Sequence, residues 1–372
     1  AGAWCGQNKY LSAIKNAFQN FMPLTIAGAI GVLWCNVLVN DQTGLGLFFK
    51  PIMALDFLNP AFQAVNFCTI SCITVGITLG IAQEIGIWNM GAERAGYIPG
   101  LVGLAAWLSV TNTSHMVDGA KEAFTGIAGN ELGATGLFTG MIIGVLSVEL
   151  FCFFEKQDAL KIKMPEQVPP GVARAFEVLV PATITLIITA CIGSACYNLT
   201  GLYLNDVIKN GIQGPLGAVG ATIPGVMIIY LVIMLFWLVG IHGNNMLSAV
   251  KEALFTPLAL ENVEAFNKGE TPKNIINMYA LQMWGEFGGS GVTIGLVIAI
   301  MIFGKREDNK AIASLSLVPG LFNINETVTF GIPMVLNPIL GIPFVVAPLV
   351  TIIIGYVLTV IGFCPVACLT VP

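Results

Sequence analysis

Long runs without a charged residue restrict most strongly what this chain can fold into. Asn210–Val250 contains no Asp, Glu, Lys or Arg, and it is about twice as long as the roughly 20 residues that a helix needs to cross a bilayer. Asn274–Gly304 is interrupted only by Glu286, and Ala311–Pro372 only by Glu326. Charged residues make up 10% of the chain and apolar residues 56%, which leaves too few charges to cover a water-facing surface. The sequence excludes a soluble enzyme and a disordered chain, and it predicts an all-α polytopic membrane protein.

The first half of the chain contains five further apolar stretches that are long enough to be membrane helices. They are Phe21–Asn40, Phe57–Gln83, Ala95–Val117, Leu132–Val148 and Val178–Asn205. Together with the second half, about ten transmembrane helices fit, some of them as half-spans. Basic residues gather in the N-terminal segment and in the linker at about 155–177, which predicts that both are cytoplasmic. The three prolines of this linker favour an amphipathic segment at the membrane interface.

The second half does not follow simple alternation of its loops. Lys251–Lys273 and Lys305–Lys310 are both basic, yet only one ordinary span separates them, so alternation would place one of them outside. Re-entrant hairpins remove this conflict, because irregular backbone is tolerated at membrane depth where it is buried or lines a wet cavity. The expected breaks are rich in glycine, proline and asparagine: Gly240–Asn245, Gly285–Gly291 and Pro319–Pro333.

Four ionisable residues stand alone within apolar sequence, and such residues are functional candidates because a charge is costly at bilayer depth. They are Glu149, His242, Glu286 and Glu326. Glu149 lies near the end of a span, where we expect it to be solvated or paired with another helix. The glycines after Glu286 are expected to pack helices closely through Gly291-x-x-x-Gly295, and Glu286 itself is an open candidate for lining a cavity.

The strongest site candidates are the polar clusters around His242 and Glu326. Carboxylate, imidazole and carboxamide groups match the hydroxyls of a sugar, and Trp237 or Trp284 offers a ring for its apolar face, whereas a small cation would want more carboxylates. The predicted substrate-binding residues are His242, Glu326, Asn325, Asn323, Trp237, Asn244 and Asn245. The cysteines lie mostly within apolar runs and form no zinc framework, so no metal or cofactor is expected. The scattered basic residues indicate no nucleic-acid partner.

An ordered set of motifs resembles a known family. The motifs are Gly-Ile-His-Gly (240–243), Thr-Pro-x-Ala-Leu-Glu-Asn (256–262), Gly-Gly-Ser-Gly (288–291) and Phe-Asn-Ile-Asn-Glu (322–326) followed by Phe-Gly-Ile-Pro (330–333). They resemble the membrane component, enzyme IIC, of bacterial sugar phosphotransferase systems, in the lactose/cellobiose/N,N′-diacetylchitobiose branch. A similar segment at 13–29 extends the resemblance over nearly the whole chain.

This resemblance implies a multi-pass protein of the bacterial cell membrane, in contact with lipid, whose residues 1–204 form a scaffold with a homodimer interface. Residues 205–372 would form the transport domain, with His242 and Glu326 as the family's binding residues. The substrate would be a β-linked disaccharide. A separate IIB protein, served by IIA and the general carriers, would phosphorylate it, while Glu326 takes the proton of a primary hydroxyl. The phosphoryl-donor cysteine is expected on IIB, so this chain would be the translocation subunit. The family normally has more residues at both ends, so we expect the chain to be part of a longer protein.

Two other classes of function use the same residues. A proton-coupled secondary transporter would use His242 and Glu326 to carry protons and would deliver unmodified sugar, whereas the phosphotransferase delivers sugar phosphate. A lipid-modifying intramembrane enzyme with His242 as a base lacks a credible nucleophile or metal set.

Overall fold

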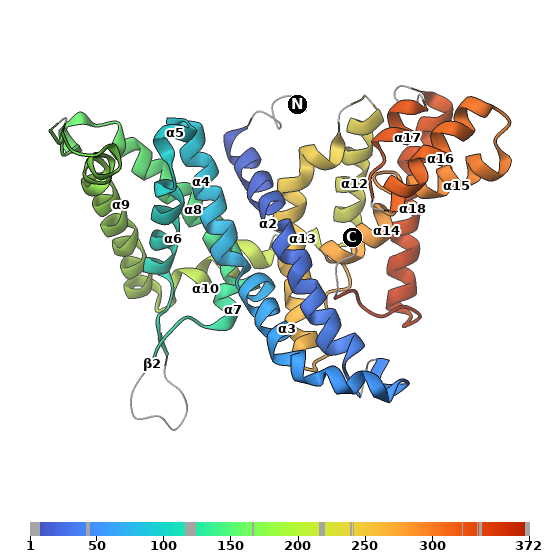
Figure 1. Ribbon diagram of the computed structural model, residues 1–372, viewed down its shortest axis with the longest axis horizontal. Coiled ribbons are helices and arrows are strands. Elements are labelled where there is room, and N and C mark those ends of the chain that lie inside the picture. The colour runs from blue at the N-terminus through green and yellow to red at the C-terminus, as the bar shows by residue number, and fades with distance from the viewer. Residues whose placement is uncertain are drawn as a thin grey trace. The chain divides into compact units, whose positions relative to one another are not determined.

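The structure is a computed structural model that describes residues 8–41, 45–115, 124–165, 167–215, 220–238, 240, 242–321, 323–332, 334 and 337–368. These parts of the chain are almost entirely helical (Figure 1). Their one sheet is an antiparallel pair of two-residue strands, β1 (Ser114–His115) and β2 (Phe124–Thr125). The predicted all-α polytopic architecture is therefore confirmed.

The chain divides into two compact units, residues 8–215 and residues 216–372, which we call the first and the second unit. The predicted division after residue 204 lies close to this boundary. The roles predicted for the two parts, scaffold and transport domain, stay predictions.

The first unit is a bundle in which α4 packs against α2, α6 and α8. Its elements are α2 (Lys9–Leu33), η1 (Trp34–Leu38), η2 (Leu45–Leu47), η3 (Lys50–Leu58), α3 (Asn59–Asn66), η4 (Phe67–Ser71), α4 (Ile73–Met90), α5 (Ala92–Ala95), α6 (Ile98–Val110), α7 (Gly129–Leu132), α8 (Ala134–Glu155), η5 (Asp158–Leu160), α9 (Pro170–Thr200), α10 (Leu204–Ile208) and η6 (Lys209–Gln213). Small residues allow the close approach to α4. A Cβ at Gly103 of α6 would lie 2.3 Å from the Cβ of Ala82, and one at Gly140 of α8 would lie 2.2 Å from Oγ1 of Thr78. Such close backbone contact is how helices associate in membranes.

Glu149 lies on α8 and pairs with a neighbouring helix. Its Oε1 is 2.5 Å from Nζ of Lys9, on α2, and its Oε2 accepts a hydrogen bond of 3.4 Å from Asn89, on α4. The predicted helix-pairing role is confirmed.

Several helices of the described parts are long and apolar enough to cross a membrane. Four qualify singly: Lys9–Leu38, Thr135–Glu155, Pro170–Thr200 and Ile339–Val360. Lys50–Ser71 and Ile73–Met90 qualify together, with a bend of 42° between them. Shorter apolar helices occur at Ile98–Val110, Ile223–Leu238 and Thr293–Phe303. The count of about ten spans stays a prediction.

The second unit has a core between helices that are distant in sequence. Its helices are α12 (Ile223–Leu238), α13 (Gly243–Asn267), α14 (Met278–Gly285), α15 (Thr293–Phe303), α16 (Glu307–Leu321), α17 (Glu326–Gly331) and α18 (Pro338–Val360). Buried apolar side chains from α12, α15, α16, α17 and α18 form one cluster, which includes Trp237, Val328 and Phe344. Helices are interrupted at all three predicted breaks, between α12 and α13, between α14 and α15, and between α16 and α17. The positions of the breaks are confirmed, and their re-entrant topology stays a prediction.

Candidate functional site

The three helix breaks of the second unit converge on Ser290, in the loop between α14 and α15. Nδ2 of Asn244, in the first turn of α13, donates a hydrogen bond of 2.8 Å to Oγ of Ser290. Nδ2 of Asn325, directly before α17, donates one of 2.7 Å to the carbonyl oxygen of the same serine. Ser290 therefore binds both the segment that follows His242 and the segment that precedes Glu326.

The glycines around Ser290 bring the loop close to the asparagines. Gly289 has a φ of 93°, and a Cβ there would lie 2.6 Å from the Cβ of Asn325. The N–H of Gly288 donates a hydrogen bond of 2.8 Å to Oδ1 of Asn323. Because only glycine adopts such a conformation without a steric penalty, the Gly-Gly-Ser-Gly sequence is what allows this contact.

The predicted helix packing through Gly291-x-x-x-Gly295 is wrong. Gly291 lies before α15 with a φ of 86°, and a Cβ there would meet the ring of Phe344 at 2.2 Å. Gly295 lies in α15, but a Cβ there would meet nothing within 4 Å. The spacing of the two glycines is that of a helical face, but Gly291 serves the turn of the loop instead.

A buried ion pair lies beside Asn244. Nζ of Lys251 pairs with Oε1 of Glu286, which also accepts a hydrogen bond of 2.7 Å from the hydroxyl of Tyr230. The side chain of Lys251 is 4% exposed and that of Glu286 15%. Nζ of Lys251 also donates to Oδ1 of Asn244 at 3.4 Å, which leaves the amide nitrogen of Asn244 directed at Ser290. The ion pair therefore fixes the orientation of Asn244.

The expectation that Lys251 begins a basic loop is wrong, because this residue is buried within α13. A buried charge is tolerated when a charge of the opposite sign is in direct contact with it. Glu286 supplies that contact to Lys251. A signal for Lys251 was present in the sequence. It follows Asn244 by seven residues, which is two helical turns and hence the same face of the helix.

Trp237 and His242 lie side by side. Their ring centroids are 4.3 Å apart with an angle of 45° between the planes. Trp237 is fully buried, and Phe344 meets it edge-on at 6.4 Å. Trp237 supports the imidazole from the apolar core, and its predicted stacking on a sugar ring stays a prediction.

For the two remaining predicted site residues, Glu326 and Asn245, the structure describes only the position of the backbone. Glu326 is the first residue of α17, and Asn245 lies in the first turn of α13. The side chains of Glu326 and Asn245 lie outside the described part of the structure, as do Phe322 and Pro333 of the family-like motif. The contacts described so far bring Asn244, Asn323 and Asn325 together around the glycine loop, and the structure adds Ser290, Lys251 and Tyr230 to them. Glu286 pairs with Lys251 and Tyr230, and its predicted role in lining a cavity stays a prediction.

The chemistry of this cluster is that of hydrogen bonding. Within the described residues, no group of three or more His, Cys, Asp or Glu side chains comes together that could hold a metal ion. The cluster's polar groups are carboxamides, hydroxyls, loop N–H groups and the ion pair of Lys251 and Glu286, and such groups can both donate hydrogen bonds to and accept them from a neutral polyhydroxyl ligand.

The chain is similar to several known proteins over most of its length. It is 33% identical to the oligo-beta-mannoside-specific EIIC component of Bacillus subtilis (strain 168), over 96% of this chain and 79% of that protein. It is 30% identical to the cellobiose-specific EIIC component of Lactococcus lactis subsp. lactis (strain IL1403), over 95% of this chain and 83% of that protein.

One solved structure has a closely similar fold. It is the crystal structure of the transporter ChbC, the IIC component from the N,N′-diacetylchitobiose-specific phosphotransferase system. The two superpose with a TM-score of 0.88 at 29% identity, over 98% of this chain and 84% of that one. The family model described as "Phosphotransferase system, EIIC" matches residues 15–370. The sequence and the fold of this chain both match those of EIIC components. The chain therefore belongs to the EIIC family of the sugar phosphotransferase system.

Proposed function

We propose that this chain carries a β-linked disaccharide, of the cellobiose or N,N′-diacetylchitobiose type, across the bacterial cell membrane while a separate IIB protein phosphorylates it. As a member of the EIIC family, the chain is a multi-pass membrane permease that works with IIB and IIA components. The proposal on the substrate is supported by the names of its relatives, which are specific for cellobiose, diacetylchitobiose and β-mannosides.

The observation that carries the proposal on the site is the convergence of two polar segments on Ser290. Asn244 and Asn325 reach this residue from positions 46 residues before it and 35 residues after it in the sequence. His242 lies two residues before Asn244, and Glu326 directly follows Asn325. We assign the sugar-binding site to this place and name His242, Glu326, Asn323, Asn325, Asn244, Asn245 and Trp237 as the residues that form it.

The mechanism follows from the needs of phosphoryl transfer, which are mainly positioning and charge stabilisation. The sugar's primary hydroxyl must point at the phosphoryl group that the IIB cysteine carries. It must lose its proton as the new P–O bond forms and the P–S bond breaks, with the cysteine thiolate as the leaving group. Glu326 is assigned to accept that proton, and His242 to hold the ring through a second hydrogen bond. The carboxamides of Asn244 and Asn325 orient the remaining hydroxyls.

The same proposal gives each unit a role. The second unit contains the polar cluster and is assigned as the transport domain. The first unit is assigned as the scaffold that contacts lipid and forms a homodimer, and the support for the homodimer is the resemblance to the family. Light scattering of the purified chain in detergent, corrected for bound detergent, tests it. A protein mass of one chain would rule out the dimer.

The experiment that tests the transport function uses inverted membrane vesicles with purified phosphorylated IIB and a panel of radiolabelled disaccharides. We expect sugar phosphate as the product, with both His242→Ala and Glu326→Gln reducing its formation at least tenfold. Matched controls are His115→Ala, which changes the chain's other histidine, in β1, and Glu307→Gln at the exposed start of α16.

Two outcomes would contradict the proposal. Full phosphorylation by both site variants would remove the site assignment. In right-side-out vesicles, accumulation of unmodified sugar that stops when an uncoupler is added would instead identify a proton-coupled transporter.

A further inference from the structure

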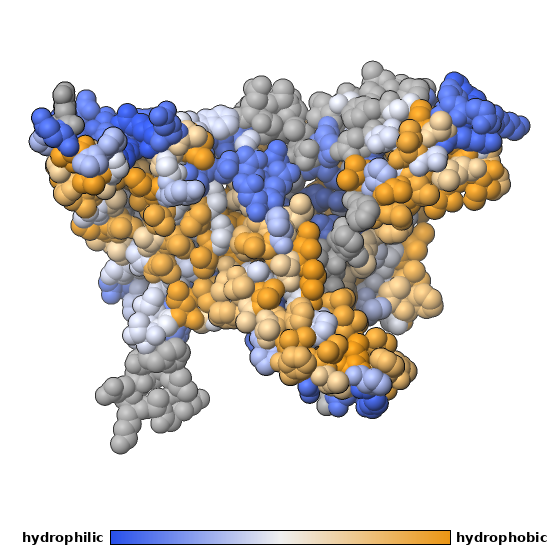
Figure 2. Space-filling view, in the orientation of Figure 1, coloured by the Kyte–Doolittle hydropathy of each residue, from blue (hydrophilic) through white to orange (hydrophobic). Residues whose placement is uncertain are grey.

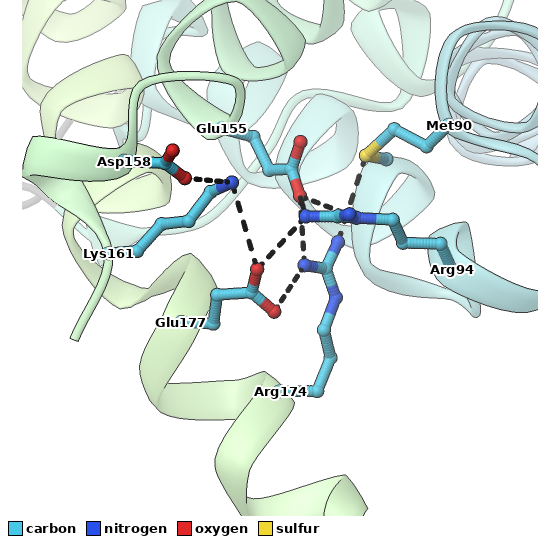
Figure 3. A network of polar contacts seen from close by, with 7 residues as sticks. All are labelled: Met90, Arg94, Glu155, Asp158, Lys161, Arg174 and Glu177. Atoms are coloured by element: carbon cyan, nitrogen blue, oxygen red, sulfur yellow. Dashed lines mark hydrogen bonds and ion pairs between the residues drawn. The ribbon is translucent and has the colours of Figure 1, made fainter. Parts of the chain in front are cut away.

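A network of charged residues lies at one end of the first unit. Figure 3 shows that it joins the short α5, the end of α8, the linker after α8 and the first turns of α9. Nη2 of Arg94 is 2.8 Å from Oε1 of Glu155 and 2.9 Å from Oε1 of Glu177. Nη1 of Arg174 contacts the same two carboxylates at 2.9 Å and 2.8 Å. The network therefore ties four segments together.

The donors in this network exceed the acceptors. Nε of Arg174 is buried and has no hydrogen-bond partner among the residues that the structure describes. Its Nη2 reaches only the sulfur of Met90, at 3.7 Å, and a thioether is a weak acceptor. Lys156, which is exposed, forms no ion pair within the described residues. A buried guanidinium N–H without an acceptor is costly, and Lys156 adds a positive charge to three cations that the three carboxylates of the network already pair.

A cavity of about 290 Å³ opens beside the network. Its lining consists of Asn89, Met90, Arg94, Glu155, Lys156 and Lys161. Three of these side chains are cationic and one is anionic. Arg94 also pairs with Glu177 at 2.9 Å and Lys161 with Asp158 at 3.1 Å, so Lys156 supplies the charge that no described carboxylate pairs. A concave surface with this imbalance attracts an anion.

We propose that this cavity binds the phosphate-bearing headgroup of an anionic phospholipid. The chemistry recognised is a phosphate ester, placed among Arg94, Lys156 and Lys161, and the position of the cavity favours a lipid as its source. In Figure 2 hydrophilic residues gather at this end of the first unit, directly beside a belt of hydrophobic residues. This is the level at which headgroups lie against a membrane protein, and basic pockets between transmembrane helices bind acidic headgroups there.

An exposed aromatic side chain beside Lys156 provides a surface for an acyl chain. Phe153 of α8 is 59% exposed. It lies three residues before Lys156, which is close to one helical turn and hence the same face. A lipid whose phosphate occupies the cavity can therefore lay a chain along α8. A free phosphate ion would gain nothing from this apolar surface.

The test measures lipid binding to the purified chain, freed of native lipid, in a neutral detergent. Native mass spectrometry counts bound molecules during titration with dioleoylphosphatidylglycerol, dioleoylphosphatidylcholine or sodium phosphate. The variants are Lys156→Gln and Lys156→Glu, since this side chain is exposed and forms no ion pair within the described residues. The matched control is Lys50→Gln, which removes an exposed lysine from η3 of the same unit.

We expect phosphatidylglycerol to bind at least five-fold more tightly than phosphatidylcholine. Lys156→Gln should weaken it about five-fold, the equivalent of the roughly 1 kcal/mol that one basic residue contributes near an anionic headgroup. Lys156→Glu should weaken it further and Lys50→Gln should leave it unchanged. Raising the salt concentration should weaken binding to the unaltered chain, which tests the charge dependence without any substitution.

Equal affinity for the two lipids would overturn the proposal, as would unchanged phosphatidylglycerol binding in both Lys156 variants or at high salt. Binding of inorganic phosphate that depends on Lys156, without any preference for phosphatidylglycerol, would identify a free anion as the ligand and overturn the assignment to lipid. None of these measurements involves sugar transport, so the outcome is independent of the proposed function.

Discussion

The ion pair between Lys251 and Glu286 offers the sharpest test of how the second unit holds its polar cluster. Replacing Lys251 by methionine keeps an unbranched chain of similar length in α13 but leaves the carboxylate of Glu286 with the hydroxyl of Tyr230 as its partner. Oδ1 of Asn244 loses its contact with Nζ in the same variant. The substitution therefore acts both on stability and on the orientation of Asn244.

The magnitude follows from the burial of the two side chains. Removing one member of a buried ion pair costs about 3–5 kcal/mol, because the other charge remains without compensation. The hydrogen bond from Tyr230 stays in place, and a bond to a charged group contributes about 1.5–3 kcal/mol. We therefore expect Lys251→Met to lower the free energy of unfolding by about 3 kcal/mol. Glu286→Gln should have a similar effect, since it leaves the ammonium group of Lys251 buried.

The double variant Lys251→Met/Glu286→Gln separates a charge effect from a packing effect. It contains no uncompensated charge, so it should be more stable than either single variant. Because each single variant is expected to lose about 3 kcal/mol, the interaction energy in the double-mutant cycle should be about 3 kcal/mol or more. The assay is denaturant unfolding of the detergent-solubilised chain, followed by tryptophan fluorescence. Sugar affinity is measured in parallel, and it should fall in every variant that lacks Lys251.

A matched control exists at the end of the same helix. Lys268 and Glu264 form an exposed pair of 2.6 Å, and exposed pairs contribute about 0–1 kcal/mol. Lys268→Met should therefore change stability by less than about 1 kcal/mol. The reasoning would be refuted if Lys251→Met were as stable as Lys268→Met, or if the losses of the two single variants simply added in the double variant.

Three further predictions concern single residues of the second unit. Gly289→Ala should destabilise the loop and weaken sugar binding at least tenfold, because the φ of Gly289 is 93°. A Cβ at Gly295 meets open space, so Gly295→Ala should stabilise α15 by about 0.5–1 kcal/mol. Both variants are measured by unfolding and sugar titration. Ser290→Ala removes one hydrogen-bond acceptor and should weaken sugar binding about five-fold, corresponding to about 1 kcal/mol, with little change in the unfolding midpoint. Asn262→Ala removes side-chain bonds that include one to the carbonyl of Ala367, and it should lower stability by about 2–3 kcal/mol and raise the protease sensitivity of the C-terminal segment.

The membrane helices were predictable because the only requirement for them is a long run of apolar residues, which can be read directly from the sequence. About 20 apolar residues without a charge satisfy a bilayer only as a helix or a closed barrel, and the described helices lie where the charge-free runs lie. The helix breaks were predictable for a related reason. Glycine, proline and asparagine within apolar sequence oppose a continuous helix, and each such group coincides with an interruption in the second unit.

The partners of the buried polar residues were not predictable in the same way. Lys251 and Glu286 are 35 residues apart, and nothing local distinguishes a lysine that is paired at depth from one that begins a loop. The exposure of an aromatic ring is likewise a tertiary property. Trp237 has the sequence surroundings of a ring that faces a ligand, yet it is fully buried against His242 and Phe344. Polar residues in an apolar run reveal where a site lies, whereas their contacts depend on segments that are far away in the chain.

The glycine loop shows how two local rules can conflict and which of them prevails. Gly291 and Gly295 have the spacing of a helix-packing motif, but that motif requires the preceding residues to be helical as well. Each glycine costs a helix interior about 1 kcal/mol relative to alanine, and Gly288, Gly289 and Gly291 together oppose the helix by about 3 kcal/mol. A loop avoids that cost and gains the hydrogen bonds of Gly288 and Ser290 to two asparagines. The density of glycines over four residues was therefore the better guide than the spacing of any two, and it is this loop that brings the two polar segments together.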